Sequence, residues 1–150
     1  MGQNDGSYKS YTAAFADTDQ YSSGGIEVIG LESLERNVRF SLKHCDTTKK
    51  HCIRNVAKDP LLLESLYKRL GHFEDMTWKN AMDTTHEGSI SIEKRSSTNY
   101  KDLKASYSDF STYGHMRIAA PKKPIFRVFG AVSGGLFYIL RFDVDGATNH

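Results

Sequence analysis

The C-terminal half of the sequence gathers cations together with one imidazole and one phenol, a set that could act on a phosphodiester. Its members are His115, Arg117, Arg127, Arg141, Lys104 and Tyr138. Cleavage of RNA through its own 2′-OH needs a base for the hydroxyl, cations for the charge that builds on phosphorus, and an acid for the leaving oxygen. The same side chains also suit phosphate binding without catalysis, so both interpretations stay open.

In the catalytic interpretation the three strand arginines and two proton-transfer candidates divide the work. Arg117, Arg127 and Arg141 hold and neutralise the scissile phosphate, and His115 or Tyr138 takes or gives a proton. This mechanism uses no metal ion, and we expect no cofactor.

A repeated dipeptide, His44-Cys45 and His51-Cys52, offers imidazole and thiolate, the usual ligands of zinc. Its spacing matches no common zinc finger or ribbon. Neighbours on a strand also point to opposite faces, so the four side chains cannot converge. We therefore expect no metal site, and we interpret Cys45 and Cys52 as small core residues without an activated thiol.

Several enzyme classes lack their sequence signatures here. The chain has no phosphate-cradling glycine loop, no nucleophile elbow and no HExxH helix. Nucleotide hydrolysis, serine hydrolysis and zinc proteolysis are therefore unsupported.

The charge is distributed in blocks, although the whole chain carries only +2. Residues 36–58 hold seven Lys or Arg and one Asp, and residues 94–141 hold nine Lys or Arg and two Asp. If folding brings the two blocks together, they form one basic face for a polyanion; otherwise they are a solvated surface without a partner. The candidate nucleic-acid contacts in these blocks are Lys104, Lys122, Lys123, Arg39 and Lys43.

A length of 150 residues with 39% hydrophobic residues fits one globular domain. Residues 1–25 contain no Leu, Ile or Val and close on Ser-Ser-Gly-Gly, which predicts a flexible arm before a domain over 26–150. The aromatic residues of the arm leave open that it docks onto a partner or onto the domain. No apolar run approaches bilayer length, so we expect a cytoplasmic protein without membrane contact.

The first half predicts one strand followed by two or three helices. Alternation over 38–42 places Val38, Phe40 and Leu42 on one strand face. Asp46-Thr47-Thr48 is a candidate N-cap for a helix over 49–57, and Asp59-Pro60 begins a second helix. The apolar side of that second helix carries Leu62, Leu63, Leu66, Tyr67, Leu70 and Phe73, with Gly71 near its end. A short third helix over 77–82 carries Trp78, Ala81 and Met82.

The second half predicts strands. Residues 89–93 alternate, 94–111 form a loop with one helical turn near 100–104, and 116–118 form a short strand. Residues 125–130 and 136–142 flank Ser133-Gly134-Gly135 as a hairpin. This order predicts an α+β fold, with helices on one face of a mainly antiparallel sheet and a C-terminal hairpin.

These C-terminal motifs resemble the RelE/ParE-like (HigB-like) toxin superfamily. The resemblance rests on Leu103-Lys104, Met116-Arg117-Ile118, Phe126-Arg127-Val128 and the final strand from Phe137 to Asp143. It covers about residues 36–145, including the expected order of strand and helical hairpin. It does not cover the arm, and the loop over 94–111 is longer than in compact members.

The resemblance implies a ribosome-dependent mRNA endonuclease held inactive by a cognate antitoxin protein. Arg117 and Arg127 would then be the strand arginines that face the phosphate, and Lys104 the lysine of the leucine-lysine pair. ParE-like members instead poison gyrase without cutting RNA, so a non-catalytic module that binds nucleic acid or protein remains the alternative. A further alternative is an interaction protein of a toxin-like operon whose aromatic arm recognises its partner.

Overall fold

The part of the chain that the structure describes folds as one five-stranded mixed sheet with three helices, an α+β architecture that confirms the predicted class. The computed structural model describes residues 33–47, 51–83, 88–94, 107 and 109–146. In chain order its elements are β1 (Arg39–Ser41), α3 (Arg54–Ala57), α4 (Pro60–Glu74), α5 (Trp78–Ala81), β2 (Ser91–Lys94), β3 (Thr112–Arg117), β4 (Arg127–Ser133) and β5 (Leu136–Asp143).

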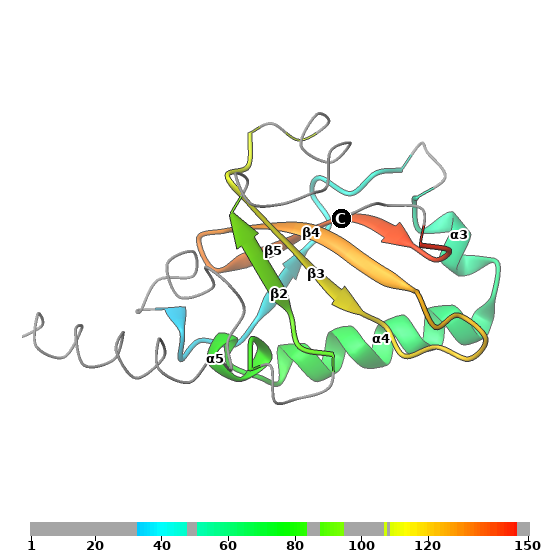
Figure 1. Cartoon of the computed structure of the whole chain (residues 1–150), viewed down its shortest axis with the longest axis horizontal. Coiled ribbons are helices and arrows are strands. Elements are labelled where there is room, and N and C mark those ends of the chain that lie inside the picture. The colour runs from blue at the N-terminus through cyan, green and yellow to red at the C-terminus, as the bar shows by residue number, and fades with distance from the viewer. Residues whose placement is uncertain (1–32, 48–50, 84–87, 95–106, 108, 147–150) are drawn as a thin grey trace, which may run out of the picture.

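The strands lie in the order β1-β5-β4-β3-β2. Strands β2 to β5 form an antiparallel meander, and β1 joins its far edge parallel to β5. The strand of the first basic block therefore lies directly beside the C-terminal strands of the second block. As Figure 1 shows, α4 runs along one face of this sheet, with α5 following at its C-terminal end.

The main core lies between the sheet and the helices. Met116, Val128 and Ile139 of the central strands pack in one cluster with Leu62 and Leu66 of α4. The largest side chains that are fully buried in the molecule include Trp78, Phe73, Phe126 and Phe137. Burial of this much apolar surface is the dominant favourable contribution to folding.

Helix α4 begins as predicted. The carboxylate of Asp59 accepts a hydrogen bond from the Leu61 amide at 3.0 Å, and Pro60 occupies the first helical position. Tyr67 was expected on the buried side but is 68% exposed, so that expectation was wrong. Its position lies beside the apolar stripe, whose buried centre is formed by Leu62, Leu66 and Phe73.

Helix α3 is shorter than predicted. It spans only Arg54–Ala57 and has no side-chain cap, so the expected start at residue 49 behind an Asp46-Thr47-Thr48 cap was wrong. The backbone of Asp46 has another role, because its amide donates to the Leu140 carbonyl of β5 at 2.9 Å. The backbone carbonyl of His51 accepts a hydrogen bond from the Phe142 amide at 2.8 Å. Both Asp46 and His51 are therefore attached to β5.

Helix α5 and the C-terminal hairpin confirm their predictions. The Thr77 hydroxyl caps α5, and Trp78, Ala81 and Met82 are buried. Gly134 and Gly135 both have positive φ, +59° and +80°, as the two-residue turn between β4 and β5 requires. The Trp78 indole donates to the Gly135 carbonyl at 2.8 Å and so links α5 to this turn.

Three strand predictions need correction. Leu42 lies beyond β1 and is 65% exposed, because the strand ends at Ser41. Strand β2 reaches Lys94, one residue into the predicted loop, and β3 begins at Thr112, well before the predicted Met116. The predicted helical turn near 100–104 and the arm over 1–25 lie outside the described residues.

Within the described part of the chain, no helix is both long and apolar enough to cross a membrane.

Candidate nucleic-acid interface

The sheet face opposite α4, here called the second face, carries its own small apolar cluster. Tyr113, Phe129, Ala131 and Leu140 form this cluster, and Tyr107 and Phe110 pack against it. Alternation along the strands separates these side chains from the main core. The second face therefore has a buried apolar part and a part with polar and charged side chains.

All five predicted catalytic residues lie on the second face. His115, Arg117, Arg127, Tyr138 and Arg141 alternate with side chains of the main core on three adjacent strands, β3, β4 and β5. Pairing arranges them in rows across the strands. One row is Arg117, Arg127 and Asp143; the next is His115, Phe129 and Arg141; a third contains Tyr113, Ala131 and Tyr138.

A β-bulge decides that Arg141 belongs to this face. Phe129 pairs with Arg141 whereas Gly130 pairs with Ile139, so β5 carries one extra residue, Leu140. Strict alternation from Tyr138 would send Arg141 into the main core. The bulge restores it to the second face beside Phe129, as an inserted residue shifts all side chains beyond it.

Arg117 and Arg127 lie directly opposite each other on β3 and β4. Arg117 is exposed and Arg127 is half-buried. Among the described residues, neither guanidinium makes a hydrogen bond or ion pair. Like charges directly opposite in an antiparallel pair repel each other. An anion placed between the two would reverse that repulsion, and a bidentate guanidinium contact to phosphate suits this role.

His115 lies two residues before Arg117 on the same face. Its ring is half-buried, with its centroid 5.7 Å from that of Phe129 and an interplanar angle of 38°. The packing against Phe129 restricts the imidazole and keeps it in the row next to the arginine pair. Histidine is the side chain whose ordinary pKa lies nearest to neutrality, so it can accept or donate a proton there.

Arg141 is nearly inaccessible, with 4% of its surface exposed. Its charge is felt by Tyr107. Burial and the charge of Asp46 raise the pKa of Tyr107, and the charge of Arg141 offsets part of this rise. Tyr107 is itself held by Tyr113, whose hydroxyl donates to the Tyr107 carbonyl at 2.8 Å. Arg141 was predicted to hold the phosphate directly. Because it is buried, it can contribute positive charge but offers almost no surface for a direct contact.

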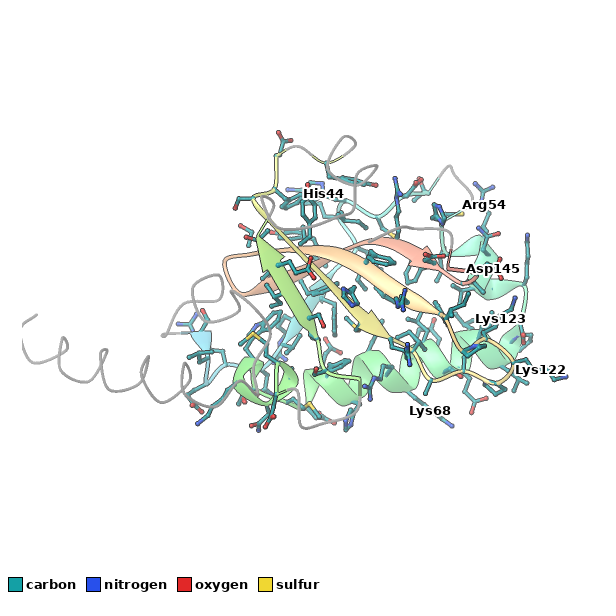
Figure 2. The ribbon with its side chains drawn as sticks, in the orientation of Figure 1. His44, Arg54, Lys68, Lys122, Lys123 and Asp145 are labelled. Carbon is teal, nitrogen blue, oxygen red and sulfur yellow. The ribbon has the colours of Figure 1, made fainter. Side chains whose placement is uncertain are left out.

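Tyr138 is part of an aromatic cluster with His44 and Phe110. Each of the three pairs of ring centroids is 5.4 Å apart. Tyr138 is half-buried, whereas His44 is exposed. Figure 2 labels His44 at the top of the view, away from the lysines of the β3–β4 turn.

The predicted nucleic-acid contacts are spread over the molecule. Lys122 and Lys123 lie in the turn between β3 and β4, close in Figure 2 to Asp145, and the Lys123 amine forms an ion pair with Asp145 at 2.8 Å. Lys122 is exposed with φ of 63°. Lys43 is exposed just beyond β1.

Two of the predicted contacts are not placed on the second face. The Arg39 guanidinium donates to the Val38 carbonyl at 3.1 Å and to the Glu74 carbonyl at 3.5 Å. It therefore lies at the C-terminal end of α4. Lys104 lies outside the described residues.

The sequence did not single out Tyr107, Phe110 or Asp46 as site residues. Tyr107 and Phe110 fall in the stretch assigned to a polar loop, where no periodicity marks a buried position. Asp46 was assigned to a helix cap. Their place at the site depends on chain crossings between distant segments, for which local sequence carries no signal.

The two cysteines differ in their environments. Burial raises the pKa of the Cys45 thiol to about 11, and the charge of Asp46 adds to this effect. A hydrogen bond from Arg54 Nε to Cys52 Sγ, 3.4 Å long, lowers the pKa of the Cys52 thiol, which is buried. Within the described ranges, no three His, Cys, Asp or Glu side chains are grouped so that they could hold a metal ion.

Comparison of the chain with protein families, with curated proteins and with solved structures finds no match.

Proposed function

We propose that this protein binds RNA through the second face of its sheet and cleaves it with the help of the RNA 2′-OH. The observation that carries the proposal is the pairing of Arg117 with Arg127, with His115 in the adjacent row of the same face. The toxin-like endoribonucleases that the sequence resembles provide the reaction type.

The arginine pair is the proposed phosphate site. Two opposed guanidinium groups outweigh the one carboxylate of their row, Asp143, and a phosphate between them receives charge-assisted hydrogen bonds from both sides. As the 2′-oxygen attacks, negative charge grows on the phosphoryl oxygens, and the same donors stabilise it further. Arg141 adds to the positive potential from its buried position.

His115 is the proposed proton-transfer residue: its neutral imidazole takes the proton of the 2′-OH as the 2′-oxygen attacks, and water gives a proton to the 5′-oxygen that leaves. Alternate residues of a strand are roughly 7 Å apart, so the His115 row lies one such step from the arginine pair. Tyr138 lies a further row away, roughly 14 Å along the strands from Arg117, and its ring packs against His44 and Phe110. A phosphate held by the pair is thus within reach of His115 and beyond reach of Tyr138.

A non-catalytic nucleic-acid-binding module is the second candidate function. It is favoured by the burial of Arg141 and by the packing of the Tyr138 ring, because these two predicted catalytic side chains are not offered to a substrate. His44, the exposed member of the cluster with Tyr138 and Phe110, would then offer a ring for base stacking.

The first test compares the double variant Arg117→Gln/Arg127→Gln with Lys68→Gln. Lys68 lies on α4, where it forms an exposed ion pair with Glu64, so the control removes a cation away from the second face. With a labelled single-stranded RNA, the double variant should lower the magnitude of the slope of log K against log salt by about 0.7, since the pair holds one phosphate and each phosphate contact contributes roughly 0.7. Lys68→Gln should leave the slope unchanged. RNA binding that is equal in all three proteins would exclude the proposed interface.

The second test separates cleavage from binding. His115→Ala should abolish cleavage while RNA affinity stays within about twofold of wild type, because only the proton transfer is removed. The wild type should leave DNA of the same sequence intact, since DNA lacks the 2′-OH, and should produce RNA ends with a 2′,3′-cyclic phosphate. RNA binding without any cleavage would instead support the non-catalytic module.

A further inference from the structure

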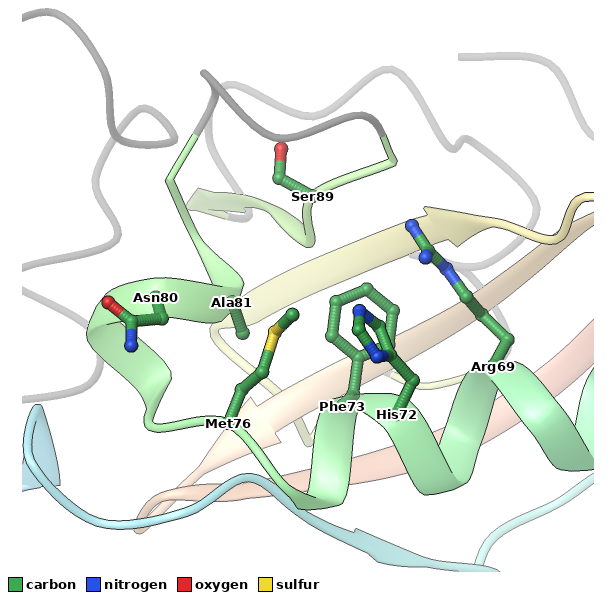
Figure 3. A pocket seen from close by; sticks show the side chains of 7 residues that line it. All are labelled: Arg69, His72, Phe73, Met76, Asn80, Ala81 and Ser89. Atoms are coloured by element: carbon green, nitrogen blue, oxygen red, sulfur yellow. The ribbon is translucent and has the colours of Figure 1, made fainter.

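A pocket of about 300 Å³ opens in the helical layer, on the side of the sheet away from the second face. It lies between the C-terminal half of α4, helix α5 and Ser89, which comes shortly before β2, as Figure 3 shows. This volume is at the lower end of the range for small-molecule sites. The lining residues are Arg69, His72, Phe73, Met76, Asn80, Ala81 and Ser89.

The chemistry of the lining is asymmetric. Phe73 and Ala81 belong to the main core and form an apolar floor with Met76. The remaining four side chains are polar, and two of them, Arg69 and His72, are basic. None of the lining residues that the structure describes is Asp or Glu. An apolar floor with a few convergent polar groups is typical of a ligand site, and the two basic side chains favour a negatively charged ligand.

Arg69 is held in place before any ligand arrives. Its Nη2 donates to the Gly88 carbonyl at 2.6 Å, and its guanidinium carbon lies 4.6 Å from the centroid of the Phe73 ring. Gly88 has φ of +72°, and a Cβ at this position would collide with Arg69 Nη2. The positive φ favours glycine at this turn, and the missing Cβ leaves room for the guanidinium. A guanidinium that is already ordered lowers the ordering cost of binding.

We propose that this pocket binds a small carboxylate with a flat apolar body. The carboxylate contacts the Arg69 guanidinium, whose geometry matches it. The apolar body lies over Met76, Phe73 and Ala81. In Figure 3 Asn80 lies at the opposite end of the pocket from Arg69, and Ser89 lies between the two, so Asn80 contacts the far end of the ligand and Ser89 its middle. This site is separate from the RNA interface and does not depend on the proposed function.

The test uses benzoate as the probe and the full chain, followed by amide chemical shifts in NMR. Benzoate should give saturable shifts for residues 69–76, 80–81 and 89. Benzyl alcohol keeps the ring without the charge, and acetate keeps the charge without the ring; both should bind at least about tenfold more weakly. Equal affinity for benzoate and either of these probes, or no saturable shift in the pocket, would overturn the proposal.

Two variants test the residues. Arg69→Gln should weaken benzoate binding by about tenfold or more, but it also removes the bond to Gly88. Asn80→Asp is nearly isosteric and places an acid in the first turn of α5, where it is favourable; its charge should repel benzoate and weaken binding about fivefold. Lys68→Gln, one residue from Arg69, should leave binding unchanged. Wild-type affinity in both Arg69→Gln and Asn80→Asp would contradict the site.

The RNA assay keeps this proposal distinct from the proposed function. Asn80→Asp should bind RNA as the wild type does, and Arg117→Gln/Arg127→Gln should bind benzoate as the wild type does.

Discussion

At the scale of single residues, the second face depends on a bulge that local sequence does not announce. The apolar run from Phe137 to Phe142 fits a simple buried strand, and simple alternation would direct Arg141 into the main core. The extra residue Leu140 reverses this. Arg117, Arg127, Tyr138 and Arg141 could be placed on predicted strands, but His115 lay before the predicted strand over 116–118, and the face that Arg141 occupies could not be deduced.

Gly130 is the residue at the bulge whose small size matters most. A Cβ there would overlap the ring of Phe137 and the carbonyl of Tyr138, and the backbone carbonyl has little freedom to move. We expect Gly130→Ala to lower the free energy of unfolding by about 3 kcal/mol, as overpacking of a core does. Denaturant unfolding followed by circular dichroism measures the change.

Gly71→Ala is the matched control for this prediction. Gly71 lies in α4, where an added Cβ would meet no atom within 4 Å. Because alanine favours the helix over glycine, this variant should raise the free energy of unfolding by about 0.5–1 kcal/mol. If the two glycine variants changed stability in the same direction, the close packing at Gly130 would be refuted.

At the scale of elements, Trp78 joins α5 to the β4–β5 hairpin. Its indole is fully buried and donates to the Gly135 carbonyl, at the turn between the two strands. Trp78→Phe leaves that carbonyl without this donor and should cost about 2 kcal/mol of unfolding free energy. Circular dichroism is the suitable readout, because the variant removes the only tryptophan of the chain.

Tyr67→Phe is the control at this scale, since it also removes a polar group from an aromatic ring. Tyr67 is exposed on α4, so its unfolding free energy should stay within about 0.5 kcal/mol of wild type. An equally small effect of Trp78→Phe would show that the link between α5 and the hairpin contributes little.

Elements with strong local signals were predictable, and those that depend on distant partners were not. Helix α4 has its cap, its proline and an apolar stripe, and it was found with the correct start. Helix α3 has no side-chain cap, and the residues expected to begin it instead bond to β5. The early start of β3 has the same cause, because Thr112 and Tyr113 are strand residues through pairing with β2 and β4.

At the scale of the whole molecule, the strand order predicts a gradient of local stability. Strand β4 is paired on both sides from Arg127 to Ala131, whereas β1 has three residues at an edge and α3 has four. Local opening costs least where few buried contacts must break. Hydrogen exchange should therefore be slowest for the amides of β4, above all those that bond to β5, and it should be fast for the amides of α3.

The edge strand β1 and helix α3 provide the check on this gradient. Amides of β1 should exchange through a smaller opening than those of β4. Exchange of α3 as slow as that of β4 would mean that the molecule opens only as one cooperative unit.

The pairing of β1 with β5 also has a consequence for the order of events during synthesis. Arg39–Ser41 is made early, yet its partners Leu136–Tyr138 leave the ribosome almost a hundred residues later. Strand β4 likewise receives its second partner only when β5 has been made. A nascent chain that stops before β5 lacks the strand that pairs with both β1 and β4, so we expect it not to complete the sheet.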